Sequence, residues 1–107
     1  MSNGFVWVIS VNDLAENQIK QVSVVGRKIL LIKREGQVYA VASHCPHKGY
    51  DLSKGFLKDN LLVCPCHDWS FDIRTGEYQT NKAIKLLTFE CKIEEDNVYV
   101  KPFNDFY

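Results

Sequence analysis

Two short Cys/His pairs constrain this chain of 107 residues more than any other feature. Cys45 and His47 are two positions apart, and sixteen residues separate His47 from Cys64, which stands three positions before His67. A proline follows each cysteine, and its fixed φ helps to form a tight turn on which both side chains can face one metal centre. The two pairs therefore predict a metal site built from two turns.

Two sulfurs and two imidazoles suit more than one kind of site. They complete the ligands of a 2Fe–2S pair in which two histidines replace two cysteines on one iron. They also satisfy a tetrahedral structural zinc site. A disulfide beside two uninvolved histidines is a third reading, but it leaves the recurrence of the pairs on two turns as a coincidence. The iron–sulfur interpretation is favoured.

Length and composition limit the class of protein that could hold this site. A chain of 107 residues with 46% hydrophobic content predicts one domain, residues 1–107, with a modest core. Thirteen basic and thirteen acidic residues cancel, so no overall field favours nucleic acid or an anionic membrane. No apolar run could span a bilayer, and residues 1–10 lack a secretory pattern. We expect a cytoplasmic protein whose cysteines stay reduced.

Strand patterns occur on both sides of the two pairs. Val22–Lys33 and Val38–Ser43 are rich in Val, Ile and Leu, and they flank a polar turn that contains Gly36. Leu86–Ile93 and Val98–Lys101 flank a polar tetrapeptide in the same way. The sequence therefore predicts two β-hairpins and an all-β fold.

The sequence also predicts an alternation of side chains in one strand and a single helical turn. The period-two alternation of Phe89, Cys91 and Ile93 predicts that these side chains face the core. One helical turn is expected at residues 12–17, with Asn12 as its N-cap. No other segment shows a helical pattern, so strands should form most of the domain.

Residues 44–80 differ in composition from the hairpins around them. They hold all three histidines, three of the four cysteines and several loop-forming Gly and Pro residues. Binding residues often lie on loops held by a rigid scaffold, so we expect a loop-rich insertion at about 44–80 on a base of about 1–43 and 81–107. The tail 103–107 has three aromatic residues, for which packing across the sheet is favoured over a partner or dimer surface.

The pairs and their surroundings resemble a known family. Cys45-x-His47, sixteen residues, and then Cys64-x-x-His67 resemble the Rieske motif. The resemblance extends through Gly49, Leu52, Gly55, Trp69, Phe71, Asp72 and Thr75-Gly76-Glu77. It covers essentially the whole chain, which is similar in length and layout to the small Rieske-type ferredoxins that supply electrons to multicomponent oxygenases.

The resemblance implies a fold and a ligand set. The fold would be a β-sandwich of antiparallel sheets with the two ligand loops at its tip. One Rieske 2Fe–2S cluster would be bound. Cys45 and Cys64 would hold its inner iron, and His47 and His67 would hold the outer iron with their rings near solvent.

The remaining cysteines and the third histidine should play other parts. The resemblance places Cys66 where high-potential Rieske proteins have a disulfide-forming cysteine, but Tyr50 occupies the partner position, so we expect a thiol. Cys91 is expected in the core. His44 should lie at the surface and point away from Cys45, because successive side chains of an extended chain alternate in direction.

The residues after the second pair imply a low reduction potential. High-potential relatives have Ser and Tyr hydroxyls where this chain has Trp69 and Phe71, which cannot donate in that way to cluster sulfurs. Asp68 replaces a glycine that is usual in ferredoxin-type relatives, and its carboxylate would further disfavour reduction. We expect a potential on the order of −150 mV.

The implied function is one-electron transfer rather than catalysis. A soluble, monomeric carrier would accept an electron from a flavin-dependent or other reductase and pass it to a terminal oxygenase or another redox enzyme. Its contacts would be transient, with only weak salt dependence. The expected docking face consists of Pro46, Lys48, Gly49, Tyr50, Pro65 and Asp68. A Rieske-like small subunit of a nitrite-reductase type enzyme and a redox sensor or zinc-stabilised interaction module are the alternatives.

Overall fold

Three antiparallel sheets form the fold in this computed structural model, which describes residues 4–46, 49, 51–65 and 68–102. The strand orders are β1-β10-β9, β2-β3-β4-β8 and β5-β6-β7. The elements are β1 Val6–Ser10, the 3-10 helix η1 Val11–Asp13, β2 Ile19–Val24, β3 Arg27–Arg34, β4 Gln37–Ala42, the 3-10 helix η2 Leu52–Lys54, β5 Phe56–Lys58, β6 Leu61–Val63, β7 Ser70–Asp72, β8 Thr88–Phe89, β9 Cys91–Glu94 and β10 Asn97–Val100. The predicted all-β, antiparallel class is confirmed.

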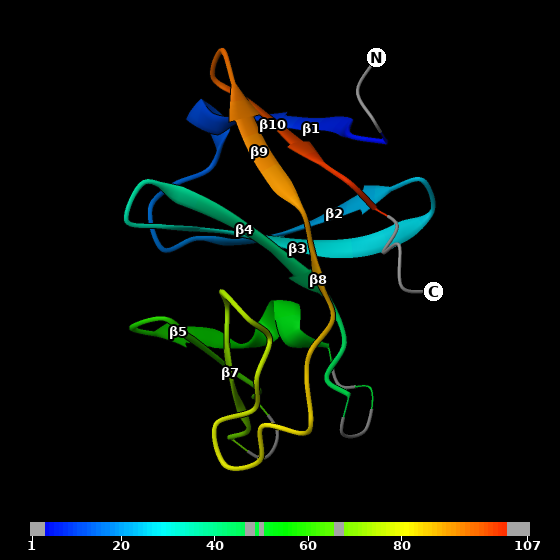
Figure 1. The fold of residues 1–107 in the computed structure, drawn as a ribbon. Coiled ribbons are helices and arrows are strands. Elements are labelled where there is room, and N and C mark those ends of the chain that lie inside the picture. Colours follow the sequence, from blue (N-terminus) through cyan, green and yellow to red (C-terminus); the bar gives the residue numbers. More distant parts are fainter. Residues whose placement is uncertain (1–3, 47–48, 50, 66–67, 103–107) are drawn as a thin grey trace.

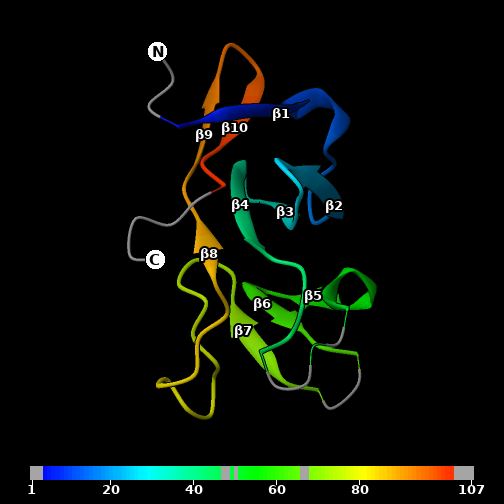
Figure 2. The ribbon, with the colours of Figure 1, turned by 90° about the vertical axis from the view of Figure 1, so that its right-hand side faces the viewer.

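The sheet β2-β3-β4-β8 lies between the other two (Figures 1 and 2). Ile29 and Leu31 of β3 pack in one core cluster with strands β1 and β10, whereas Leu30 and Ile32 pack in a second cluster with β6 and β7. All four side chains are fully buried. Successive side chains of a strand point to opposite faces, so this uninterrupted apolar run is covered on both sides.

The first predicted hairpin is confirmed at β3 and β4. Its turn, Glu35-Gly36, has positive φ at both residues, as a two-residue hairpin turn of type I′ requires. The predicted strand Val22–Lys33 is nevertheless divided, because Val25 and Gly26 form a second turn of this kind between β2 and β3. A β-branched residue at the first turn position is unusual, and it conceals this turn in the sequence.

The second predicted hairpin is confirmed at β9 and β10. The predicted strand Leu86–Ile93 is wrong, because the chain passes from one sheet to another at Glu90, between β8 and β9. The expected inward alternation therefore fails along this stretch. Phe89 is buried, Cys91 is half-buried, and Ile93 is 40% exposed.

The helical turn expected at residues 12–17 is wrong in position and type. The 3-10 helix η1 begins one residue earlier, and Ser10 caps it by accepting a hydrogen bond at Oγ from the N–H of Asn12. Glu16, within the expected turn, accepts hydrogen bonds from the two backbone N–H groups of the β3–β4 turn. Its carboxylate thus joins two segments distant in sequence.

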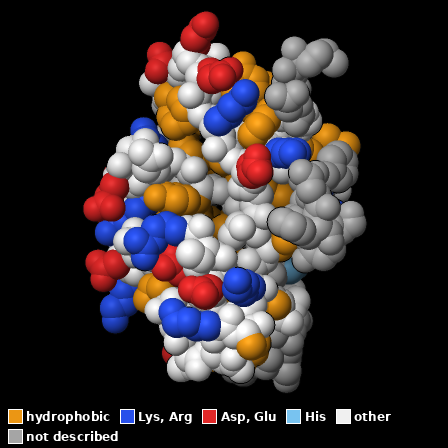
Figure 3. All heavy atoms as spheres, in the orientation of Figure 1, with side chains coloured by type: hydrophobic (Ala, Val, Ile, Leu, Met, Phe, Trp, Pro, Cys, Tyr) orange, Lys and Arg blue, Asp and Glu red, His pale blue; other side chains and the backbone are white. Residues whose placement is uncertain are grey.

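The surface carries charges of both signs, interspersed on the face drawn in Figure 3. Among the described residues, four large hydrophobic side chains are also exposed: Trp7, Val25, Phe56 and Ile93. In the described part of the chain, no helix is long and apolar enough to cross a membrane. Phe56 lines one of the two grooves described below, and Val25 directly precedes Gly26, which lines the other.

Candidate metal centre

Cys45 and Cys64 reach the same part of the interior from two different loops. Cys45 lies three residues after the end of β4, and Cys64 directly follows β6. They are 2% and 1% exposed, and both belong to the core cluster between the middle sheet and the β5-β6-β7 sheet. Neither cysteine forms a disulfide within the described part of the chain. Two buried cysteines that come from separate elements and share one core cluster fit the sulfur ligands of a single centre.

A backbone hydrogen bond closes the first loop. The N–H of Gly49 donates to the carbonyl of Cys45 at 2.8 Å, and Gly49 has φ +72°, a conformation that glycine adopts readily. The N–H of Leu52 donates to the carbonyl of Ser43, which ties together the chain on either side of this loop. The predicted ligand His47 lies between Cys45 and Gly49 in sequence and is outside the described residues.

The second loop is closed in a similar way. The N–H of Cys64 donates to the carbonyl of Trp69 at 2.7 Å. Asp68, immediately before Trp69, has φ +57° and is exposed. The predicted ligand His67 falls within this loop in sequence and is also outside the described residues. Each loop that contains a predicted histidine ligand therefore begins at a buried cysteine.

An aromatic stack holds the end of the second loop. The rings of Trp69 and Tyr78 are stacked, with centroids 4.1 Å apart and planes 6° from parallel, and the buried ring of Phe71 is tilted against both. Tyr78 is anchored in turn by its N–H, which donates to the carbonyl of Ile84. The sequence did not identify Tyr78 as part of the site; its only signal was its position directly after the Thr75-Gly76-Glu77 segment.

A close backbone approach links the two loops. A Cβ atom at Gly55 would lie 2.2 Å from the carbonyl oxygen of Val63, which no side chain could tolerate without a shift. The N–H of Gly55 also donates to the carbonyl of Leu52. Because Val63 directly precedes Cys64, glycine at position 55 lets the chain leaving the first loop pack against the root of the second.

Polar groups beside the first loop are satisfied locally. Asp51 accepts hydrogen bonds at Oδ1 from the hydroxyl and the backbone N–H of Ser53, and these bonds hold the pKa of Asp51 below its ordinary value. The Nδ1 atom of His44 lies 3.0 Å from Oγ of Ser43. As predicted, His44 is exposed whereas Cys45 is buried.

Cys91 belongs to a different environment. It packs against the core cluster on the far side of the middle sheet, and burial raises the pKa of its thiol to about 12. A thiol held in its protonated form is a poor metal ligand, because thiolate is the ligating form. Cys66 and the aromatic tail 103–107 lie outside the described residues, so their predicted roles stay predictions.

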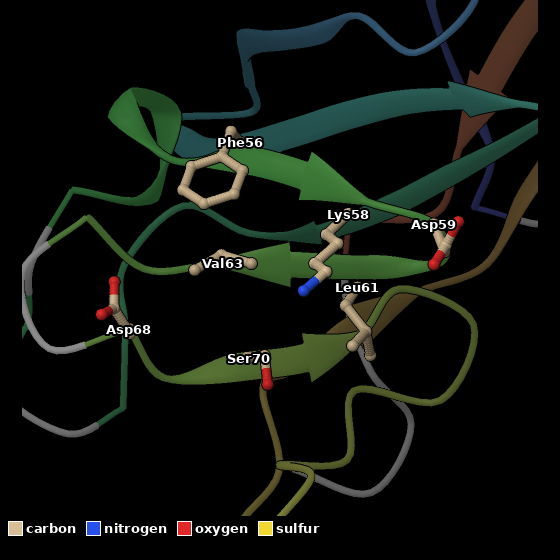
Figure 4. A pocket seen from close by; sticks show the side chains of 7 residues that line it. All are labelled: Phe56, Lys58, Asp59, Leu61, Val63, Asp68 and Ser70. Atoms are coloured by element: carbon tan, nitrogen blue, oxygen red, sulfur yellow. The ribbon is translucent and has the colours of Figure 1, made fainter.

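A groove of about 400 Å³ opens on the outer face of the β5-β6-β7 sheet (Figure 4). Phe56 and Val63 lie toward the end nearer Asp68, Lys58 extends over the middle, and Asp59 lies at the other end. The charged groups are spread along the groove instead of converging on one point. The groove therefore lacks the arrangement that is typical of a substrate site.

The structure is an antiparallel β domain with two cysteines buried in one core cluster, and the comparison with known families assigns it to a class. Residues 4–90 match the family described as Rieske [2Fe-2S] domain. The chain belongs to this family, and the cofactor of such a domain is a 2Fe–2S cluster. The buried thiols of Cys45 and Cys64 fit that cofactor.

Individual relatives differ in length. The chain is 31% identical over 102 residues to the ferredoxin component of the naphthalene 1,2-dioxygenase/salicylate 5-hydroxylase systems of Ralstonia sp, covering 94% of this chain and 98% of the relative. It is 37% identical over 95 residues to apoptosis-inducing factor 3 of Homo sapiens, covering 88% of this chain but only 16% of that relative. Among the first matches, the chain thus spans only a small part of some much longer proteins.

One solved structure is similar to this chain over nearly its whole length. A chain from the complex of reduced oxygenase and oxidized ferredoxin in carbazole 1,9a-dioxygenase is 28% identical, with a TM-score of 0.82. The alignment covers 91% of this chain and 92% of that one. The likeness supports the predicted antiparallel sandwich over nearly the whole length.

Proposed function

We propose that this protein carries single electrons on a 2Fe–2S cluster bound by Cys45, Cys64, His47 and His67. The cluster supplies the one-electron redox chemistry. The observation that carries the proposal is the burial of both cysteines at the roots of two closed loops, each of which contains one of the histidines in sequence. We keep residues 44–80 as the cluster-binding insertion on the β base.

In this proposal, Cys45 and Cys64 bind the cluster through their sulfur atoms, and the residues around them exclude water from those sulfurs. Leu52, Leu62 and Phe71 are fully buried in the same core cluster as the two cysteines. This apolar surrounding limits solvent access to the cysteine sulfurs, which is one of the factors that set the potential of an iron–sulfur centre. Protein residues thus contribute ligation, burial and a docking face.

The acceptor that we propose is a terminal oxygenase, and the donor is a reductase. Relatives named as ferredoxin components of oxygenase systems, and a related chain in an oxygenase–ferredoxin complex, support the acceptor. We propose a monomer in a reducing compartment such as the cytoplasm, with transient contacts near the two loops. Of the expected docking face, Pro46, Gly49, Pro65 and Asp68 lie in the described part and are exposed.

A second candidate is a Rieske module that acts within a larger redox assembly. The match to a segment of a much longer relative favours this candidate. Purification of the protein from its native source distinguishes the two functions, because a module of an assembly would elute with large partner chains.

Metal analysis tests the proposal. We expect about two irons and two inorganic sulfides per chain, with the electron paramagnetic resonance signal of a reduced 2Fe–2S pair. Cys45→Ser and His67→Ala should lose this signal, whereas the control Cys91→Ser should keep it. Zinc in place of iron, or a normal cluster in His67→Ala, would overturn the proposal.

A further inference from the structure

A second groove of about 400 Å³ lies where the β2–β3 turn, the end of β4 and β8 meet. Its apolar lining comes from Ala42, Leu87 and Phe89. The N–H of Ala42 donates to the carbonyl of Leu87 at 2.8 Å, so backbone pairing holds this apolar floor in place. The groove is therefore built partly on the middle sheet and not on a loop alone.

The charged lining of this groove is entirely basic. Arg27 and Lys28 are exposed and line it, and no acidic residue lines it in the described part of the chain. The guanidinium of Arg27 lies 5.5 Å from the ring centroid of Phe89, which places this charge over the apolar floor. Neither cation belongs to an ion pair within the described residues. The combination favours an anionic occupant with an apolar side chain.

The turn at the edge of the groove presents an exposed hydrophobic residue at a conformational cost. Val25 directly precedes Gly26, which lines the groove, and it is 63% exposed with φ +51°. A β-branched residue in the left-handed region is a genuine outlier, and such outliers cluster at functional sites. An asparagine or glycine would suit this turn better. The exposed valine is therefore a candidate contact residue.

The groove also adjoins the candidate metal centre. His44 lines it and directly precedes Cys45, where the first ligand loop begins. A partner segment seated here would lie next to the root of that loop. This position connects the groove with electron transfer.

We propose that this groove and Val25 form a docking surface for an acidic segment of a redox partner, with an apolar side chain of that segment on the Ala42/Leu87/Phe89 floor. This inference rests on the proposed function, because it assigns a surface to the carrier's partner. Acidic side chains of the partner would pair with Arg27 and Lys28. Val25 would add apolar contact at the edge.

A binding titration tests the surface directly. The probe is the acetylated, amidated peptide Asp-Glu-Leu-Glu-Asp, added to the oxidised, cluster-loaded protein while backbone amide NMR signals are followed. We expect the largest shifts at residues 25–28 and 87–89. Shifts centred on Lys58 or Lys82, or no shifts at millimolar peptide, would overturn the proposal. Shifts at the groove that depend only on protein concentration would assign it to a second copy of this chain and would also overturn it.

Charge reversal gives a matched comparison. Arg27→Glu/Lys28→Glu should bind the peptide about tenfold more weakly, because each exposed charge contributes modestly. Lys54→Glu/Lys58→Glu makes the same change in net charge at exposed sites outside the groove and should have less than a twofold effect. Equal losses in both double variants would show a general charge effect and refute the assignment.

A substitution at Val25 distinguishes an effect on peptide binding from an effect on stability. Val25→Asn should raise the melting temperature, because it relieves the strained turn, and should weaken peptide binding about threefold through the lost apolar contact. Unchanged binding would remove Val25 from the surface. Iron content and the paramagnetic resonance signal should be the same in all these variants. A wild-type protein that contains no cluster would refute the proposed function. A wild-type protein that contains the cluster but does not bind the peptide would refute only this inference.

Discussion

The indole ring of Trp69 stacks on the phenol ring of Tyr78, with centroids 4.1 Å apart and planes 6° from parallel. Because the carbonyl of Trp69 also accepts the N–H of Cys64, the stack fixes the end of the second ligand loop. Tyr78→Ala should reduce the free energy of unfolding by about 2 kcal/mol and lower iron content. Tyr78→Phe keeps the stacked ring and should retain the cluster. Chemical denaturation and iron analysis check both variants, and full iron loading of a destabilised Tyr78→Ala would show that the loop does not depend on the stack.

Asp68 occupies a backbone conformation that favours glycine, next to the predicted ligand His67. Asp68→Gly should stabilise the fold by about 1 kcal/mol. It should also raise the reduction potential above a starting value on the order of −150 mV, because it removes a negative charge beside the cluster. Potentiometric titration and thermal unfolding measure the two effects.

Asp59 supplies the control for this change. It too has positive φ, +54°, but it lies in the turn between β5 and β6, and its exposed carboxylate is 3.9 Å from the guanidinium of Arg34. Asp59→Gly should give a similar gain in stability and leave the potential nearly unchanged. Equal potential shifts in the two variants would contradict a local effect of Asp68.

A substitution at Gly55 tests the close packing between the two loops that hold the predicted ligands. Gly55→Ala places a methyl group against the carbonyl of Val63, and we expect a loss of roughly 3 kcal/mol together with poor cluster loading. Gly36→Ala is the matched control, since its φ is +77° but no atom of the described residues lies within 4 Å of the added Cβ. That control should cost about 1 kcal/mol and keep its iron. A similar loss in both variants would refute the steric account.

The buried thiol of Cys91 should lower the free energy of unfolding at alkaline pH. Burial raises the pKa of its thiol from 9.0 to about 12, so between these values the unfolded chain releases a proton that the folded chain retains. Stability from this group is complete below pH 9 and declines as the pH rises to 12, by at most about 1.4 kcal/mol per pH unit. Cys91→Val should flatten this decline in urea unfolding series. Parallel pH profiles for the two proteins would contradict the assignment.

The sequence predicted the parts of the fold whose signals are local. Gly36 in a polar turn marked the β3–β4 hairpin, and the structure confirms it. Val25 hid the β2–β3 turn because valine is untypical there. The side-chain alternation around Cys91 failed because the chain changes sheets at Glu90, which depends on tertiary packing and not on local pattern.

The candidate site was predictable to the extent that its residues form a motif. Spacing and residue type predicted Cys45 and Cys64 as ligands, and their burial in one core cluster is compatible with a shared role. Spacing could not show that Tyr78 supports Trp69, because a ring stack depends on how two segments meet in space. The assignment of His47 and His67 as ligands remains a proposal.

Pulsed electron paramagnetic resonance of the reduced protein tests the central claim most directly, because it detects nitrogen nuclei bound to the paramagnetic cluster. With ¹⁵N-histidine labelling, the account predicts couplings from two imidazole nitrogens, and both should disappear as a pair when the cluster is lost in His47→Ala or His67→Ala. A 2Fe–2S signal without strong histidine nitrogen coupling would contradict ligation by His47 and His67.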